Sequence, residues 1–199
     1  MSGYANLREF TKNSPTVEIP CVDATPKSLN GLGRIINPSD FKSHKVTYTH
    51  MKDHVTGRLL IIPREETEGK FYVWQENGFS FARNEAVGSG LYTVAKVDVD
   101  NPYKFYFREV NYHPECTQIV IPEEKSPFIM ILGTSPESLK AYIFDGSCGF
   151  EIFSGIWHQP PVLHYTGRLT FLNKQAKSHI CVVYDSVKEH GYWLSFSYA

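Results

Sequence analysis

The residues best suited to chemistry are concentrated in the stretch NYHPECTQ, from Asn111 to Gln118. It combines an imidazole (His113), a carboxylate (Glu115) and two amides, and an apolar, strand-like run follows it. An imidazole exchanges a proton near neutral pH and also binds metals, so it suits either kind of site. Glu115 lies two residues after His113 and therefore shares its face on an extended strand. This stretch is predicted to form one wall of a pocket.

A second histidine, His158, lies in the stretch FSGIWHQPP, far along the chain from the first. We expect His113 and His158 to meet inside a β-roll, to face one hollow and to act as a general acid–base pair. Trp157 precedes His158, so on a strand it points to the opposite face and packs there, and Tyr112 has the same relation to His113. In the alternative interpretation, both histidines are hydrogen-bonded core residues without a catalytic role.

Most of the remaining chain has the pattern of short β-strands. Runs of β-branched and aromatic residues are separated by Gly, Pro, Asn or Asp, and no βαβ rhythm is present. The predicted strands cover residues 44–50, 58–62, 70–76, 91–99, 103–110, 117–122, 128–133, 140–145, 168–173, 179–185 and 192–198. So many short strands favour an all-β sandwich or barrel with a few short helices.

Helix signals are confined to three places, which begin at Thr25, Ser135 and Asp185. Each place starts with a residue type that caps a helix, and each has room for only about two turns. The polar residues 1–16 are expected to form a flexible arm, and residues 17–199 a single β domain.

The composition narrows the class of partner. The net charge of −1 provides no field for nucleic acid or an anionic membrane, so neither is expected as a partner. The first residues lack the apolar core of a signal peptide, and no apolar run reaches the roughly 20 residues of a membrane span. The four cysteines form no CxxC pair and are predicted to be reduced thiols. A cytoplasmic location is therefore expected.

The two histidine stretches resemble the paired metal-binding motifs of the cupin jelly rolls. In this register Asn111, His113 and Gln118 occupy the ligand positions of the first motif, and Gly155 and His158 match the second. Two amides stand where the family has charged or imidazole ligands, and amides add no charge to offset the desolvation of a metal ion.

The resemblance implies a metal held by His113, Gln118 and His158, with Glu115 as a further ligand. Because the donors are mostly neutral, a divalent metal would be held weakly, and no cofactor is expected to be bound tightly.

Three longer stretches resemble the ureidoglycolate lyase family, a bicupin fold in which two β-rolls are fused. They are PKSLNGLGRIINP, YHPECTQIVIPEEKSPFIMILG and the segment from KAYIFDGSCGFEIFSGIWHQPP to the C-terminus. The resemblance implies a cupin-like β-sandwich or barrel, a homodimer, and the splitting of ureidoglycolate into glyoxylate and urea in purine catabolism. The stretch 71–92 departs from these lyases and resembles an uncharacterised branch of the superfamily.

The implied reaction needs groups that hold a small carboxylate substrate. Arg83 is the first candidate, because its planar fork binds a carboxylate at two points, and Lys125 is the second. Asn84 and Glu85 share the stretch with Arg83 and are predicted to line the lip of the pocket. Asn111 and Gln118 are expected to hydrogen-bond the urea or carbonyl group.

Three hypotheses remain open. The first is a carbon–nitrogen lyase of the ureidoglycolate type, or a relative acting on another small hydroxy or oxo acid. The second is a non-catalytic, cupin-type protein that binds a metabolite, and the third is a metal-dependent cupin enzyme. Turnover of ureidoglycolate would support the first hypothesis. Ligand-induced stabilisation without turnover would support the second, and loss of activity to a chelator would support the third.

Overall fold

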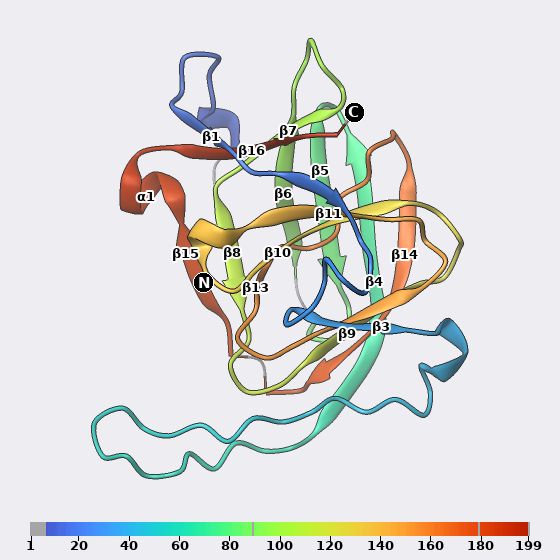
Figure 1. The fold of residues 1–199 in the computed structure, drawn as a ribbon, viewed down its shortest axis with the longest axis vertical. Coiled ribbons are helices and arrows are strands. Elements are labelled where there is room, and N and C mark those ends of the chain that lie inside the picture. The colour runs from blue at the N-terminus through green and yellow to red at the C-terminus, as the bar shows by residue number, and fades with distance from the viewer. Residues whose placement is uncertain (1–6, 89, 179, 199) are drawn as a thin grey trace.

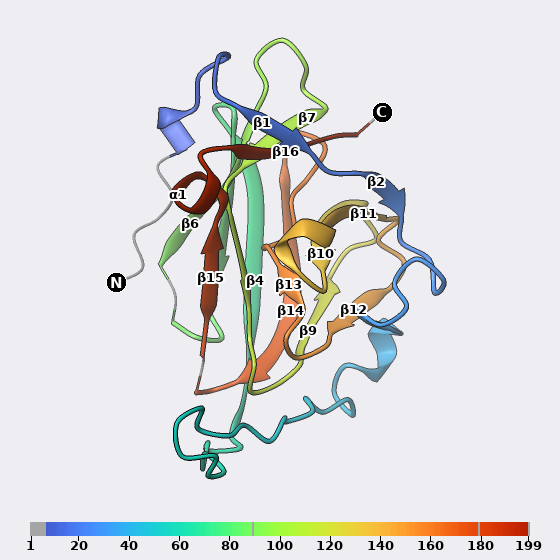
Figure 2. The ribbon, with the colours of Figure 1, turned by 60° about the vertical axis from the view of Figure 1, so that its left-hand side comes forward.

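The computed structural model describes residues 7–88, 90–178 and 180–198, and strands dominate them. The predicted all-β class is confirmed: two mixed sheets contain the strands, and the helices are few and short. Figures 1 and 2 show the sheets packed face to face. Among the described residues, no helix is long and apolar enough to cross a bilayer.

The larger sheet has ten strands, of which the long ones form its middle. In spatial order they are β1 (Thr16–Glu18), β16 (Trp193–Ser197), β7 (Lys104–Phe107), β6 (Leu91–Val97), β5 (Phe79–Asn84), β4 (Glu66–Glu76), β14 (Arg168–Ala176), β9 (Gln118–Pro122), β12 (Gly149–Ile152) and β3 (Gly33–Ile36). Only β1 pairs in parallel in this sheet, with β16.

The smaller sheet has six strands and covers the face of the larger one. Its spatial order is β15 (Val182–Asp185), β8 (Glu109–Tyr112), β13 (Trp157–His158), β10 (Phe128–Gly133), β11 (Lys140–Phe144) and β2 (Cys21–Asp23). The strand β13 is only two residues long, and it joins β8 to β10. It follows Gly155, whose φ of 79° is the left-handed turn conformation that glycine adopts without strain.

Aromatic and aliphatic side chains from both sheets fill the space between them. Phe128 and Phe144 stack with ring centroids 4.8 Å apart, and Phe105 and Phe196 stack at 4.9 Å. The strand β10 is buried along its whole length, as its unbroken apolar sequence predicts. This packed core holds the two sheets rigidly around the polar cavity described below.

Two of the predicted strands are wrong. Residues 44–50 and 58–62 lie in a long connection that makes only isolated bridges, Tyr48 with Cys116 and Lys52 with Leu59. The connection projects from the lower end of the body in Figure 1. Alternating apolar residues form a strand only where a neighbouring strand supplies partners along its length, and here the chain leaves the sheets. Strands β1, β2, β3, β5 and β12 were not predicted, and β13 was expected only as the strand that carries Trp157 and His158.

The short helices differ in how well they follow the prediction. The signal at Asp185 gives α1 (Ser186–His190), whose first turn donates two backbone N–H groups to the Asp185 carboxylate. The signal at Ser135 gives a single 3₁₀ turn, η3 (Pro136–Ser138), and the segment after Thr25 forms turns. A further 3₁₀ turn, η2, spans Pro38–Asp40.

The flexible arm predicted at residues 1–16 can be compared with the structure only from residue 7 onward, because residues 1–6 lie outside the described residues. The 3₁₀ turn η1 (Leu7–Glu9) packs against the body, with Leu7 and Phe10 buried against Tyr106 and Trp193. The Phe10 ring stacks on Tyr106 at 4.1 Å between centroids. These apolar contacts hold residues 7–10 in place, in contrast to the expected flexible arm.

Candidate functional site

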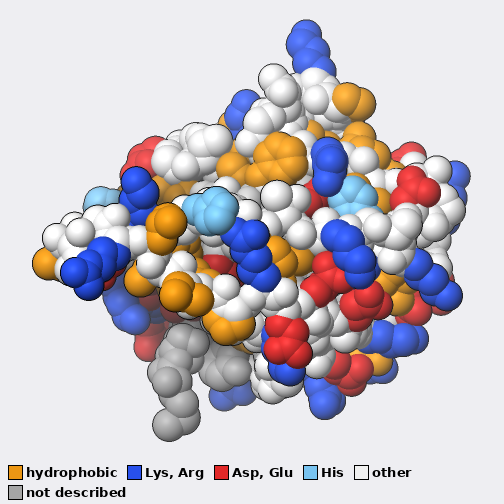
Figure 3. Space-filling model, turned by 90° about the horizontal axis from the view of Figure 1, so that it is seen from below, with side chains coloured by type: hydrophobic (Ala, Val, Ile, Leu, Met, Phe, Trp, Pro, Cys, Tyr) orange, Lys and Arg blue, Asp and Glu red, His pale blue; other side chains and the backbone are white. Residues whose placement is uncertain are grey.

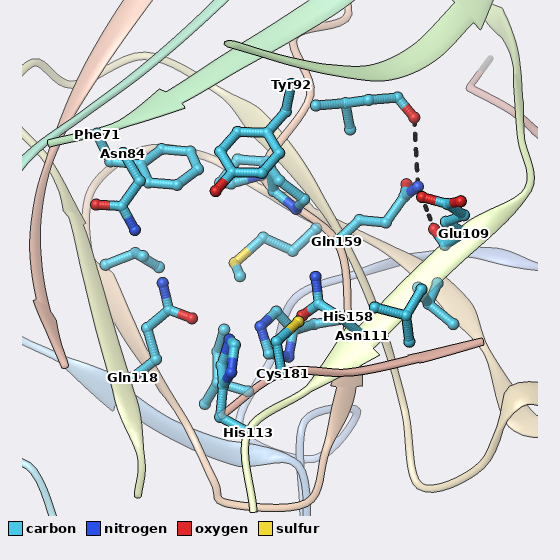
Figure 4. A pocket seen from close by; sticks show the side chains of 18 of the residues that line it. Phe71, Asn84, Tyr92, Glu109, Asn111, His113, Gln118, His158, Gln159 and Cys181 are labelled. Atoms are coloured by element: carbon cyan, nitrogen blue, oxygen red, sulfur yellow. Dashed lines mark hydrogen bonds between the residues drawn. The ribbon is translucent and has the colours of Figure 1, made fainter. Parts of the chain in front are cut away.

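A cavity of about 140 Å³ lies between the sheets. A single water needs roughly 10–15 Å³ on a comparable measure, so the cavity has room for a small metabolite. Its apolar wall includes Phe71, Val120 and Met130, and its polar wall comes from β5, β8, β9, β13 and the residues that follow them. Figure 4 shows these polar side chains converging from several strands.

His113 and His158 lie side by side in this cavity. Their ring centroids are 5.1 Å apart, and the residues are 6% and 5% exposed. His113 directly follows β8, and His158 lies on β13, directly opposite Asn111 of β8. The structure therefore brings together the two imidazoles that the sequence places far apart.

Both imidazoles are oriented by backbone carbonyl groups. His113 Nδ1 lies 2.7 Å from the Ile180 carbonyl oxygen, and His158 Nδ1 lies 2.8 Å from that of Ile156. A carbonyl only accepts hydrogen bonds, so each Nδ1 must carry a proton. In the neutral ring Nε2 is then the basic nitrogen, and it can accept a proton without a change of tautomer.

The neighbours of the histidines point away from the cavity, as strand alternation predicts. Tyr112 and Trp157 pack edge to face, with centroids 4.6 Å apart, and Trp157 also contacts Tyr184 at 6.1 Å. Trp157 therefore packs on the face opposite the histidines, as predicted. These rings support the far side of β8 and β13 and fix the strands that carry the histidines.

A network of buried amides forms another wall. Asn84, on β5, and Gln118, on β9, line the cavity, and Asn173 and Gln175, on β14, link them. Gln118 Nε2 donates to Asn173 Oδ1 at 2.9 Å, and Asn84 Nδ2 donates to Gln175 Oε1 at 3.0 Å. Asn173 Nδ2 lies 3.3 Å from Asn84 Oδ1. Buried amides joined in this way hold one another rigidly.

Gln159 extends the polar wall next to His158. Its Nε2 donates to the backbone carbonyls of Val94 and Glu109, which Figure 4 shows as dashed lines. Within the described part of the chain, the side-chain carbonyl oxygens of Asn111, Gln118 and Gln159 are buried without a hydrogen-bond partner. Leaving such an oxygen unpaired costs about 1–3 kcal/mol, which favours a ligand or water that donates hydrogen bonds there.

The charged residues of the cavity wall are Arg108 and Glu109. Arg108 is already paired: it meets Asp185 at two points, 2.8 and 2.9 Å, and Glu9 at 3.3 Å. Burial opposes ionisation of Asp185, but the Arg108 hydrogen bonds outweigh it and lower the pKa of this carboxyl. The described residues of the cavity wall therefore have no net positive charge to offer a carboxylate.

The residues predicted to bind a substrate carboxylate lie elsewhere. Arg83 and Glu85 are exposed, and neither lines the cavity, although Asn84 between them does. Along β5 successive side chains face opposite sides of the sheet, so the buried Asn84 requires Arg83 and Glu85 to face outward. Lys125 lies exposed in the turn between β9 and β10. The structure brings together the histidines and amides of the prediction and leaves out its cations.

The donor set does not fit a tightly held divalent metal. Among the described residues, no three His, Cys, Asp or Glu side chains form a group that could hold an ion. Glu115 does not line the cavity: its Oε1 accepts the Ile180 backbone N–H at 2.9 Å, and burial raises its pKa. The histidines and Gln118 are neutral donors, which cannot offset the desolvation of a divalent ion. No step is therefore assigned to a metal.

The four cysteines are free thiols, as predicted. Cys181 lines the mouth of the cavity, and partial burial together with the carboxylates of Glu115 and Glu109 raises the pKa of its thiol. Burial raises the pKa of Cys116 to about 12. The nucleophile in cysteine chemistry is the thiolate, so these shifts argue against a nucleophilic role for either residue.

The sequence interpretation missed several polar residues of the cavity wall, among them Gln159, Glu109 and Tyr92. Gln159 directly follows His158, and Glu109 begins β8, so both lie beside motifs that had been identified. Tyr92 lies in the strand predicted at residues 91–99, where no site residue was expected, and Figure 4 shows its hydroxyl directed into the cavity. Strand parity alone does not separate a cavity from a filled core, because both lie on the buried face.

The surface and the comparisons add little to this geometry. Figure 3 shows acidic and basic side chains interspersed over the face it displays, without a large area of one sign.

Comparison with protein-family models gives no match to this chain, and comparison with curated proteins gives none either. The site is therefore interpreted from its own atoms.

Proposed function

We propose that the cavity is the active site of a small-molecule enzyme that cleaves a carbon–nitrogen bond in a ureido compound, with His113 and His158 as the proton-transfer pair. The observation that supports it is the pair itself: two buried imidazoles 5.1 Å apart, each held by a backbone carbonyl through Nδ1. General acid–base catalysis by such groups typically contributes about 10²–10⁴-fold in rate.

The proposed reaction uses one neutral and one protonated histidine of the pair. In a carbinolamine a neutral histidine takes the hydroxyl proton, the oxygen forms the carbonyl, and the carbon–nitrogen bond breaks with its electrons going to nitrogen. A protonated histidine then supplies the proton that the departing nitrogen needs. The mechanism requires one neutral and one protonated ring, and two imidazolium charges this close would repel.

The ureido end of the substrate would occupy the interior. Gln118 and Gln159 present carbonyl oxygens there, and a ureido group carries the N–H donors that match them. A carboxylate, where the substrate has one, would be directed to the mouth. The mouth lies beside β15, because the lining residues Cys181 and Val183 are exposed there.

A turnover assay tests the proposal. Ureidoglycolate and hydroxymethylurea are both carbinolamines of urea, but only the first has a carboxylate. Urea release followed by NMR should exceed the rate in buffer, and His158→Gln should abolish the excess. The control Arg83→Ala, at an exposed residue of β5 in the other sheet, should retain it. Rates equal to buffer for both compounds would overturn the proposed reaction.

A second candidate is binding without chemistry, favoured by the rigid amide wall and the apolar wall of Phe71, Val120 and Met130. Pockets of that composition bind metabolites whether or not they catalyse. A ligand-induced rise in melting temperature with no turnover would identify this function. Stoichiometric metal in the purified protein, with activity lost to a chelator, would instead support a metal-dependent enzyme.

A further inference from the structure

We infer that the cavity recognises a group with several N–H donors, such as an amidine, a urea or an amide, and that Asn84 and Asn173 impose this preference by fixing the orientation of the Gln118 amide. The inference rests on the proposed function only in taking this cavity as the ligand site. The preference depends on which atoms of the buried amides are oxygen and which are nitrogen, and the hydrogen-bond partners of each amide determine this.

A backbone N–H fixes the orientation of the first amide, that of Asn84. Ala86 N lies 3.0 Å from the side chain of Asn84, and a backbone N–H can only donate. The Asn84 atom at that position must therefore be the carbonyl oxygen. The same oxygen lies 3.3 Å from the Asn173 side chain, so Asn173 must direct its NH₂ group there.

The constraint continues from Asn173 to Gln118. With its NH₂ group directed to Asn84 and to Gln175, Asn173 directs its oxygen to Gln118, 2.9 Å away. Gln118 must meet that oxygen with Nε2. Its own oxygen is left over, and Figure 4 shows this oxygen directed to the middle of the cavity. A backbone group outside the cavity thus determines which atom Gln118 presents.

The amide of Gln159 also directs its oxygen to the cavity, because of a separate set of hydrogen bonds. Its Nε2 donates to the backbone carbonyls of Val94 and Glu109, which can only accept. Its Oε1 is then fixed as an acceptor, and it is buried without a partner among the described residues. Two independent constraints therefore present two amide oxygens to one small cavity.

The charges near the cavity favour the same kind of ligand. Arg108 is already paired with Asp185 and Glu9, so its charge is not available to a carboxylate ligand. A carboxylate ligand would place its oxygens against the oxygens of Gln118 and Gln159, and neither amide can turn without breaking its own hydrogen bonds. A site built in this way rejects the wrong ligand because buried groups are left unpaired.

Three probes of nearly equal shape test the preference: acetamidinium, acetamide and acetate. Binding is measured by protein-observed NMR titration, which needs no turnover. We expect affinity to fall in that order, with acetamidinium about tenfold or more tighter than acetate. Acetate binding as tightly as acetamidinium would overturn the inference. Selectivity that persists in the absence of turnover would instead overturn the proposed reaction and leave this inference standing.

The positioning role of Asn173 is tested by Asn173→Leu, which removes the acceptor for Gln118 Nε2 and lets the amide turn. The ratio of acetamidinium to acetate affinity should fall to about threefold or less. Lys174→Met is the matched control: it is the next residue of β14, equally buried, and its Nζ donates to the Phe41 and His44 carbonyls away from the cavity. An equal fall of the ratio in both variants would show general loosening and overturn the assignment.

A measurement on the unaltered protein covers the case in which Asn173→Leu does not fold. The side-chain NH₂ of Gln118 should show NOEs to protons of Asn173. NOEs from this NH₂ group to the rings of His113 or His158 would mean that nitrogen faces the cavity, and would overturn the inferred orientation.

Discussion

Arg108 and Asp185 form a buried two-point ion pair beside the cavity, with Nε 2.9 Å from Oδ1 and Nη2 2.8 Å from Oδ2. Asp185 also caps α1 by accepting the N–H groups of Val187 and Lys188. One carboxylate therefore joins β15, α1 and the strand region around β8. Arg108 is the only arginine among the cavity-lining residues of the described structure, and the ion pair makes its charge unavailable to a ligand.

Arg108→Met should destabilise the protein by about 3–5 kcal/mol at neutral pH, because it leaves a buried carboxylate without its partner. The pKa of Asp185 is lowered in the folded state, so the stabilising effect is present above its unfolded value of 3.8 and is lost as the pH falls through the folded value. The difference between variant and parent should therefore shrink towards acidic pH. Urea unfolding at several pH values measures it.

The control for that substitution is Lys104→Met. Lys104 pairs with Glu18 at 3.1 Å, but the Glu18 side chain is 53% exposed. Exposed pairs contribute about 0–1 kcal/mol, so this variant should unfold close to the parent. Equal losses in the two variants would contradict a special role for the buried pair.

His113→Gln and His158→Gln should each reduce turnover by about 10²–10⁴-fold. The double variant should be little worse than either single one, because the two rings act as a unit and losing one partner already removes the proton transfer. Steady-state rates with affinity measured separately test this. Losses that multiply in the double variant would mean that the histidines act independently.

Arg83→Ala and Lys125→Ala should leave substrate affinity within about twofold of the parent, since both side chains are exposed and lie outside the cavity wall. The sequence alone predicts the opposite, because it assigns the substrate carboxylate to these cations. A titration with ureidoglycolate decides between the two. A large loss of affinity in either variant would show that the substrate binds on the outer face of β5 or at the turn after β9.

His164 should make the protein less stable as the pH falls. It lies between Tyr165 and Tyr198, at 5.2 and 4.6 Å between ring centroids, and burial lowers its pKa below the ordinary value of 6.5. The unfolded chain then takes up the proton more readily, so stability rises with pH through this range. His164→Phe, which retains a ring, should flatten the pH dependence of the unfolding midpoint.

The exposed His54 provides the comparison. His54→Gln should leave the slope of stability against pH as it is in the parent. If His164→Phe and His54→Gln change this slope equally, burial of His164 is not its cause.

The sequence by itself determined the all-β class, most of the central strands and the faces of several side chains. His113 and His158 share the cavity while Tyr112 and Trp157 pack on the other side, because successive residues of any strand face opposite ways. This property is local, so it can be read from neighbouring residues without knowledge of the sheets.

The tertiary structure alone decided which strands are neighbours and therefore which polar groups meet. Residues 44–50 have a strand pattern but lie beside no full strand, and the charge of Arg108 in the cavity wall is paired with Asp185, far along the chain. The Gln118 oxygen faces the cavity because β14 lies between β4 and β9 and carries Asn173 there. Hydrogen-bond and charge partners depend on contacts between distant segments, and a local sequence pattern does not contain them.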